Sequence, residues 1–202
     1  MKIGSLFTGT GALDLAAKEV FGAEPAWFVE FDKHASALLE HHWPEIPNYG
    51  DVTKVDWSEV PHVDIITGGS PCQDLSTSGK RAGMTEGTRS NLWVAMREAI
   101  EIIKPRFVVW ENVQGALSAK AESESDLESE GGLLGKNKRG HLRALGRVVG
   151  DLHEIGYDAE WTTIRASDIG APHQRARVFL LAWRRGDFEP GQGSPDSHGK
   201  GL

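Results

Sequence analysis

The sequence predicts an α/β fold built on a doubly wound, mainly parallel sheet. Short apolar runs alternate with segments whose apolar residues recur at helical spacing. Two of the runs, residues 63–67 and 107–110, are typical of parallel strands buried on both faces. This alternation predicts strands that are connected by helices crossing over the sheet.

The first half of the chain supplies three strand–helix units and a fourth strand. The strands are expected at residues 3–7, 26–29 and 63–67, and the helices at 12–21, 32–42 and 92–103. The third helix is the best supported, because Leu92, Met96 and Ile103 fall at helical spacing. Pro105 ends it before the fourth strand, at 107–110.

The pattern changes after Glu111. Residues 118–140 are polar and Gly-rich and include five acidic residues, which favours a solvated, mobile insertion. The elements that follow are a helix at 142–152 and two closing strands at 157–165 and 178–183. Residues 185–202 are rich in Gly, Pro, Ser and charge, so we expect a disordered tail after a single domain over 1–184.

Composition restricts the class of protein. With 202 residues, 39% of them hydrophobic, the chain can form one core. Its single cysteine excludes an internal disulfide and fits a reducing compartment. No apolar run has the length of a membrane span, and no signal peptide precedes the first strand. We therefore expect a cytoplasmic protein without membrane contact.

The first candidate site follows the first strand. Residues 7–11, Phe-Thr-Gly-Thr-Gly, lie where glycines let the backbone approach a ligand, although glycine there also serves packing alone. Glu30 ends the next strand and could accept hydrogen bonds from ribose hydroxyls, and Asp51 could accept one from an exocyclic amine. Each acid alone is more simply a loop residue or a helix cap. Together they indicate an adenosine pocket.

Cys72 lies in a sharper motif, Gly-Gly-Ser-Pro-Cys-Gln at residues 68–73. A lone cysteine is usually a small buried hydrophobe. This one, however, lies in a loop at the carboxyl end of a strand, where active-site groups of open α/β sheets gather. Nearby positive charge would favour the thiolate, which is the nucleophilic form.

Two further motifs lie near the last central strands. Glu-Asn-Val at 111–113 follows at the end of the strand expected at 107–110, and Gln-Arg-Ala-Arg at 174–177 leads into the final strand. Arg175 and Arg177 alternate, so both leave the same strand face. Either arginine alone would most simply form a surface salt bridge.

The chain resembles the DNA (cytosine-5-)-methyltransferase family over residues 2–183. The resemblance rests on four motifs in this order: Phe-x-Gly-x-Gly, Ser-Pro-Cys-Gln, Glu-Asn-Val and Gln-Arg-x-Arg. The resemblance implies a Rossmann-like S-adenosylmethionine-dependent methyltransferase fold, with three αβα layers and an antiparallel last strand in a mostly parallel sheet. It also implies S-adenosyl-L-methionine as cofactor and double-stranded DNA as substrate, in restriction-modification or another form of DNA methylation.

Catalytic roles are implied by the same resemblance. The Cys72 thiolate attacks carbon 6 of a flipped-out cytosine, carbon 5 takes the methyl group, and loss of its proton releases the thiolate. Glu111 holds the ring nitrogen and the exocyclic amine. Arg175 and Arg177 lie near the cytosine carbonyl and the thiolate.

Binding residues are carried over residue by residue. Residues 73–89 match a mobile loop that closes over DNA, and Asn112 is expected mainly to brace the loop. The implied substrate-side residues are Pro71, Gln73, Ser76, Lys80, Arg81, Arg89 and Asn112. The implied cofactor residues are Phe7, Gly9, Gly11, Glu30, Phe31, Asp51, Val52 and Leu92. No metal site is expected, because the eight histidines show no ligand spacing.

Two features depart from the family pattern. The family usually continues into a target-recognition region and a closing motif, and neither is found before Leu202. A second subunit that supplies them, a truncated chain and a minimal enzyme all stay open. The net charge of −7 also requires that basic groups be concentrated in one cleft or that another chain make most DNA contacts. The alternative functions are cytosine methylation of tRNA and non-catalytic binding of cofactor, DNA or a partner.

Overall fold

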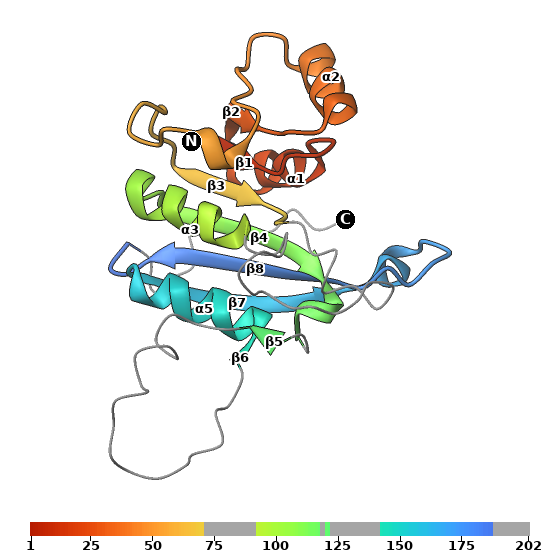
Figure 1. Cartoon of the computed structure of the whole chain (residues 1–202). Coiled ribbons are helices and arrows are strands. Elements are labelled where there is room, and N and C mark those ends of the chain that lie inside the picture. The colour runs from red at the N-terminus through yellow and green to blue at the C-terminus, as the bar shows by residue number, and fades with distance from the viewer. Residues whose placement is uncertain (71–91, 118–119, 122–141, 188–202) are drawn as a thin grey trace, which may run out of the picture.

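The computed structural model describes residues 1–70, 92–117, 120–121 and 142–187. Within them, six strands form one mixed sheet in the order β2-β1-β3-β4-β8-β7 (Figure 1). The strands are β1 (Lys2–Leu6), β2 (Glu24–Val29), β3 (Ile65–Gly68), β4 (Phe107–Val113), β7 (Tyr157–Ile164) and β8 (Arg177–Arg184). β1 pairs in parallel with β2 and β3, and β3 with β4, whereas β8 is antiparallel to β4 and β7. The predicted antiparallel last strand is confirmed, and it lies inside the sheet.

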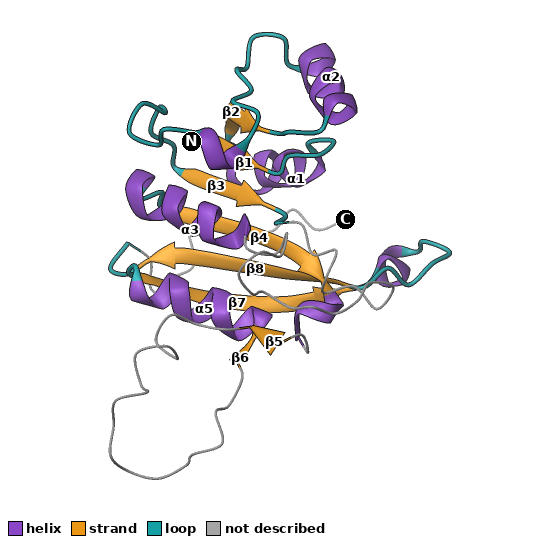
Figure 2. Ribbon diagram, viewed as in Figure 1, coloured by secondary structure: helices purple, strands orange, loops and turns teal. Residues whose placement is uncertain are grey.

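Helices cover both faces of the sheet (Figure 2). The longer helices are α1 (Ala12–Phe21), α2 (Lys33–His42), α3 (Leu92–Ile103) and α5 (Ala144–Glu154). Neighbouring strand residues point to opposite faces. Ile66 and Val108 belong to the apolar cluster that contains α3 and α5, while Ile65 and Phe107 share a second cluster with Ala17 of α1. The three αβα layers predicted for the fold are therefore present.

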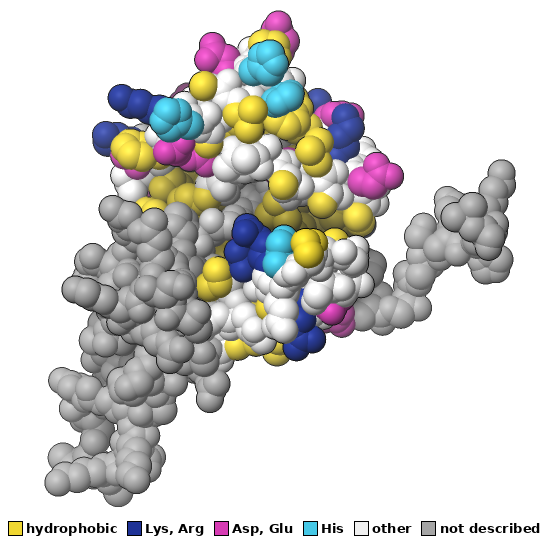
Figure 3. Space-filling view, turned by 90° about the vertical axis from the view of Figure 1, so that its right-hand side faces the viewer, with side chains coloured by type: hydrophobic (Ala, Val, Ile, Leu, Met, Phe, Trp, Pro, Cys, Tyr) yellow, Lys and Arg dark blue, Asp and Glu magenta, His cyan; other side chains and the backbone are white. Residues whose placement is uncertain are grey.

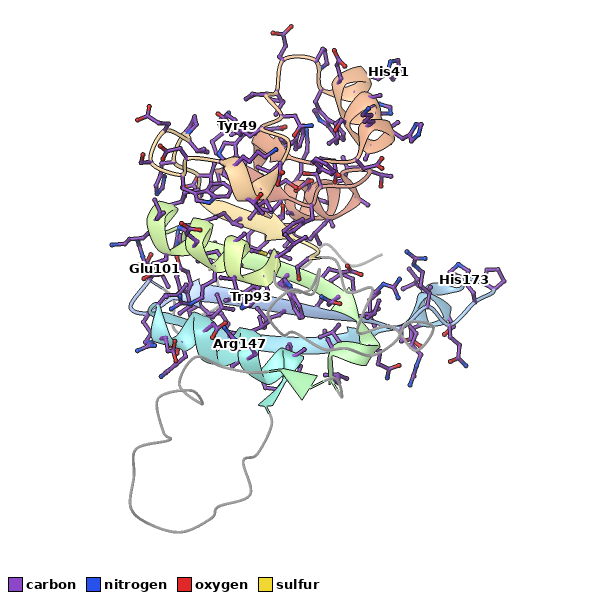
Figure 4. The ribbon with its side chains drawn as sticks, viewed as in Figure 1. His41, Tyr49, Trp93, Glu101, Arg147 and His173 are labelled. Atoms are coloured by element: carbon purple, nitrogen blue, oxygen red, sulfur yellow. The ribbon has the colours of Figure 1, made fainter. Side chains whose placement is uncertain are left out.

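A buried acid joins α3 to α5. Asp151 is 6% exposed, and its carboxylate accepts hydrogen bonds from the Trp93 indole at 2.7 Å and from the Arg147 guanidinium at 2.8 Å. Figure 4 labels these two partners on adjacent helices. A buried carboxylate is tolerated where charge and hydrogen bonds compensate its lost hydration. The hydrogen bond between Trp93 and Asp151 therefore holds α3 and α5 together on one face of the sheet.

Several predicted boundaries need correction. β4 was expected to end at Trp110, but it continues to Val113 because β8 pairs with it along its whole length. Leu142 was expected in a helix, but it lies in the short strand β6 (Leu142–Arg143), which pairs with β5 (Lys120–Ala121). The ends of the predicted insertion thus meet, and the residues between them lie outside the described part. Of the predicted tail, residues 185–187 form a turn and 188–202 are not described.

The strand order places a crevice at the carboxyl edge of the sheet. β1 has β2 on one side and β3 on the other, so the connection that follows β1 leads to β2 and the connection that follows β3 leads the opposite way, to β4. Open α/β sheets bind ligands at such switch points, outside the carboxyl ends of their strands. The loops that follow β1 and β3 therefore lie at the expected binding edge. No helix in the described segments is long and apolar enough to cross a membrane.

Candidate active site

The loop after β1 has an unusual backbone. Phe7 has a φ of 54°, a conformation that costs a non-glycine residue on the order of 1 kcal/mol. Its amide donates to the Val29 carbonyl at 2.9 Å, which ties the loop to the end of β2. Gly11, with a φ of 76°, starts α1 against Trp43, whose ring would lie 2.9 Å from an added Cβ. Strain of this kind is commonly kept at binding sites.

Glu30 is fixed at the end of β2 by backbone donors. Its two carboxylate oxygens accept from the Gly9 and Asp32 amides, each at 2.7 Å. The Asn48 side chain accepts from the Glu30 amide at 2.9 Å and thereby holds its backbone. Each carboxylate oxygen can still accept another hydrogen bond. Glu30 is therefore an oriented acceptor at the edge of the crevice.

A cavity of about 550 Å³ opens beside Glu30. Its size is in the range of small-molecule sites. It is lined by Phe7, Val29, Glu30, Phe31, Asp32, Gly50, Asp51, Val52, Gly69 and Leu92. This set contains six of the eight residues expected to bind cofactor, and the exceptions are Gly9 and Gly11. The structure thus gathers most of that set around one space.

Asp51 has a local structural role beside this cavity. Its carboxylate accepts from the Thr53 hydroxyl at 2.8 Å and the Thr53 amide at 3.1 Å, which caps a short helical turn, η1 (Val52–Lys54). These hydrogen bonds, with a smaller effect of the Lys54 charge, hold the pKa of Asp51 below its ordinary value. The helix-cap alternative is therefore realised, and the same carboxylate also lines the cavity.

A second cavity, of about 510 Å³, adjoins the first. Phe7 and Gly69 line both. The second is lined on one side by the 7–10 loop and α1, and on the other by Glu111, Arg175, Arg177 and Phe179. Figure 3 views this edge of the molecule, where hydrophobic side chains line recesses and basic and histidine side chains gather below them. An acidic and basic cluster thus lies next to an apolar pocket with oriented acceptors.

Glu111 and Arg177 form the centre of this cluster. The Arg177 Nε lies 2.9 Å from Glu111 Oε1, and both side chains are less than one third exposed. Burial raises the pKa of Glu111 above its ordinary value, and the charges of Arg177 and Arg175 oppose that rise. Gly69 leaves room for the carboxylate, because an added Cβ would lie 3.2 Å from its Oε2. Arg175 adopts a φ of 35° at the exposed side.

β4 fixes the chain that leads to Cys72. The Trp110 indole donates to the Ser70 hydroxyl at 3.0 Å, and the Asn112 amide donates to the Ser70 carbonyl at 3.2 Å. Asn112 is 2% exposed and therefore braces this loop from inside the fold. The other substrate-side and loop residues lie outside the described part of the chain: Pro71, Cys72, Gln73, Ser76, Lys80, Arg81 and Arg89.

Asp14 is a buried residue of this region that the sequence did not single out. Its carboxylate, 1% exposed, accepts from the Ser5 hydroxyl at 2.8 Å and the Thr67 hydroxyl at 2.5 Å. It therefore connects α1 to the ends of β1 and β3. Burial raises its pKa to about 6, although both hydrogen bonds act in the opposite direction. An acid in the first turn of a helix has the same sequence pattern as an exposed one, so no local signal distinguishes it.

Within residues 1–70, 92–117, 120–121 and 142–187, no three His, Cys, Asp or Glu side chains lie close enough together to hold a metal ion.

Comparison with known proteins identifies the family. A family model described as C-5 cytosine-specific DNA methylase matches residues 1–197. The chain belongs to this family. The chain is 30% identical over 187 residues to the orphan methyltransferase M.SPRI of Bacillus phage SPR, covering 91% of the chain and 38% of that protein. It is also 30% identical over 221 residues to an Escherichia phage P1 protein named DNA N-6-adenine-methyltransferase, covering 93% and 29%. The chain thus spans about a third of the length of these two relatives.

The fold of this family member also matches solved structures. A mutant of Spodoptera frugiperda DNMT2 superposes with a TM-score of 0.66 at 18% identity, covering 96% of this chain and 53% of that one. At this identity the likeness concerns the fold. The predicted family and the predicted Rossmann-like fold are therefore confirmed, while the roles of individual residues stay predictions.

Proposed function

We propose that this methylase chain transfers a methyl group from S-adenosyl-L-methionine to carbon 5 of a flipped-out cytosine in DNA, through a covalent adduct with Cys72. The observation that carries the proposal is the pair of adjoining cavities. One holds oriented carboxylates and apolar walls, and the other holds Glu111 with its arginines. Phe7 and Gly69 are the wall common to both, so groups bound on either side would meet there.

The residues of the first cavity suit an adenosine-containing cofactor. Glu30 presents fixed acceptors that match the vicinal hydroxyls of a ribose, and Asp51 presents one for an exocyclic amine. Phe31 and Val52, which line the same cavity, would flank the planar base, and Leu92 would close the apolar side. When bound, the cofactor's sulfonium supplies an electrophilic methyl group. Phe7 and Gly69, which line both cavities, would hold the methyl end of the cofactor where the two cavities adjoin.

Glu111 serves the cytosine. Its raised pKa favours a shared proton between the carboxyl and the ring nitrogen, which stabilises the charge that develops when the thiolate adds to carbon 6. Arg177, 2.9 Å away, fixes the carboxyl orientation, and Arg175 adds positive charge beside the ring carbonyl. The addition makes carbon 5 nucleophilic, and after methylation the loss of its proton releases Cys72.

The proposal assigns catalysis and cofactor binding to residues 1–184. A second subunit or additional residues would recognise the base sequence, because contacts with base edges need a surface that enters a DNA groove, beyond these two cavities. We place the reaction in the cytoplasm of a prokaryotic or phage-infected cell.

The test combines the purified chain, labelled S-adenosylmethionine and a mixed-sequence duplex, with a matched duplex that carries 5-fluorocytosine. Because fluorine cannot leave as a proton does, turnover would trap the protein on DNA, and Cys72→Ser would not be trapped. Label in N6-methyladenine, or label only in tRNA, would replace cytosine in DNA as the substrate. If neither the chain alone nor the chain with a target-recognition partner transfers label, the proposal is wrong and a binding role replaces it.

A further inference from the structure

A loop between β7 and β8 projects from the carboxyl edge of the sheet (Figure 1). We call residues 165–176 the β7–β8 arm. Its backbone is bonded internally: the Ala166 amide donates to the Gln174 carbonyl at 2.7 Å, and the Ala171 amide donates to the Ala166 carbonyl at 3.0 Å. The Asp168 carboxylate accepts from the Arg165 amide at 2.9 Å. The arm therefore has a defined shape, although much of its surface is exposed.

The side chains of the arm combine positive charge with one exposed apolar side chain. Arg165 and His173 are exposed, and Asp168, the one acidic residue of the arm, is engaged by a backbone amide. Ile169 is 82% exposed, more than any other large hydrophobic side chain in the described segments. A single exposed apolar residue is ordinary. An exposed isoleucine on a hydrogen-bonded loop, with Arg165 before it and His173 after it in the sequence, fits a partner that is anionic and has apolar surfaces.

The arm is continuous with the proposed cytosine site. Its return limb runs through Arg175 directly into Arg177, which contacts Glu111 at 2.9 Å. His173, labelled in Figure 4, lies at the outer end of the arm and points away from the sheet. A nucleic acid whose base enters the Glu111 cavity would therefore pass its backbone along the arm.

We propose that the β7–β8 arm docks DNA beside the target cytosine, with Arg165 and His173 on phosphates and Ile169 against the neighbouring sugar or base. The inference rests on the proposed function, because it assumes a DNA substrate. Guanidinium and imidazole N–H groups bind phosphate oxygens, and apolar side chains pack on sugars and unstacked bases. Both chemistries are present on one preorganised loop, which lowers the entropy lost on binding.

The two contacts differ in their salt dependence, which makes them separable. Each phosphate contact adds about 0.9 to the steepness with which the logarithm of affinity falls against the logarithm of salt concentration. At 0.1 M salt one such contact therefore strengthens binding by about eightfold. Arg165→Ala should therefore weaken duplex binding by about eightfold at 0.1 M salt and reduce the slope by about 0.9. Ile169→Ser should weaken binding by roughly fivefold at every salt concentration with an unchanged slope, because its contact is apolar.

The experiment measures duplex affinity of the full chain by fluorescence anisotropy at four salt concentrations, with cofactor affinity as a folding control. Lys18→Ala is the matched control, because Lys18 is an exposed cation in the last turn of α1, toward the opposite edge of the sheet. If both arm variants bind duplex like the wild type while the wild type methylates DNA, the arm proposal is wrong and the proposed function stands. If the wild type neither binds nor methylates DNA, alone or with a target-recognition partner, both proposals are wrong. The arm proposal is also wrong if Arg165→Ala and Ile169→Ser lose no more affinity for the duplex than the control Lys18→Ala does.

Discussion

Asp14 is a buried carboxyl whose ionisation opposes folding, and Asp14→Asn tests this. The side chain is 1% exposed, and burial raises its pKa from 3.8 to about 6. Between these values the folded chain keeps a proton that the unfolded chain has released, so the free energy of unfolding falls as pH rises. The difference corresponds to about 3 kcal/mol at pH well above both values.

Asparagine removes this dependence and keeps the shape. Its Oδ1 can accept from the Thr67 hydroxyl and its amide can donate to the Ser5 oxygen, which preserves the connection between α1, β1 and β3. We expect the unfolding free energy of Asp14→Asn, minus that of the wild type, to rise by about 2 kcal/mol between pH 4.5 and pH 7.5. Urea titrations at pH 4.5, 6.0 and 7.5, followed by tryptophan fluorescence, measure it.

Asp56→Asn is the matched control. Asp56 is an exposed aspartate whose pKa is lowered, chiefly by the Ser58 hydroxyl and amide. The substitution removes an interaction of the ionised carboxylate that is present above about pH 4. The unfolding free energy of Asp56→Asn, minus that of the wild type, should therefore stay level or fall as pH rises. A difference for Asp14→Asn that is equal at all three pH values would refute the reasoning, because Asp14 would then ionise in the folded chain as in the unfolded one.

Two further variants test the proposed site. Glu111→Gln should lower the methylation rate by about 10²- to 10³-fold. It should leave cofactor affinity unchanged, because Glu111 lines the second cavity and not the first. A parallel loss of cofactor affinity in calorimetry would contradict this. Asn112→Ala should destabilise the fold by about 1–3 kcal/mol, because a buried hydrogen bond to the Ser70 carbonyl is lost; an unchanged urea midpoint would show that this brace is dispensable.

Local patterns predict the elements of this fold well, because each depends on residues near in sequence. α1 occupies residues 12–21 as expected, and α3 ends at Ile103, two residues before Pro105. The errors arise where distant pairing decides. β4 extends to Val113 because β8 supplies seven paired residues, and Leu142 joins a strand because residues 120–121 pair with it. Neither partner is visible within a local window.

The candidate site shows the same division. Motif order placed Phe7, Glu30 and Leu92 together, and they line one cavity. The residues that support the site, Asp14 and Asn48, were not predicted. An aspartate in a first helical turn and an asparagine in a turn are common for local reasons. Their role depends on which strand ends they reach, and that is fixed only by the tertiary fold.

The distribution of charge answers the objection that an acidic protein should not bind DNA. Acids at the carboxyl edge are engaged locally: Glu30 accepts from the Gly9 amide, and Asp32 accepts from the amides of His34 and Ala35. Engaged carboxylates still carry charge, but the screening length near physiological salt is about 8 Å. A phosphate at the β7–β8 arm therefore experiences the arginines beside it more than the net charge of −7. Affinity then depends on where charges lie, which composition alone cannot show.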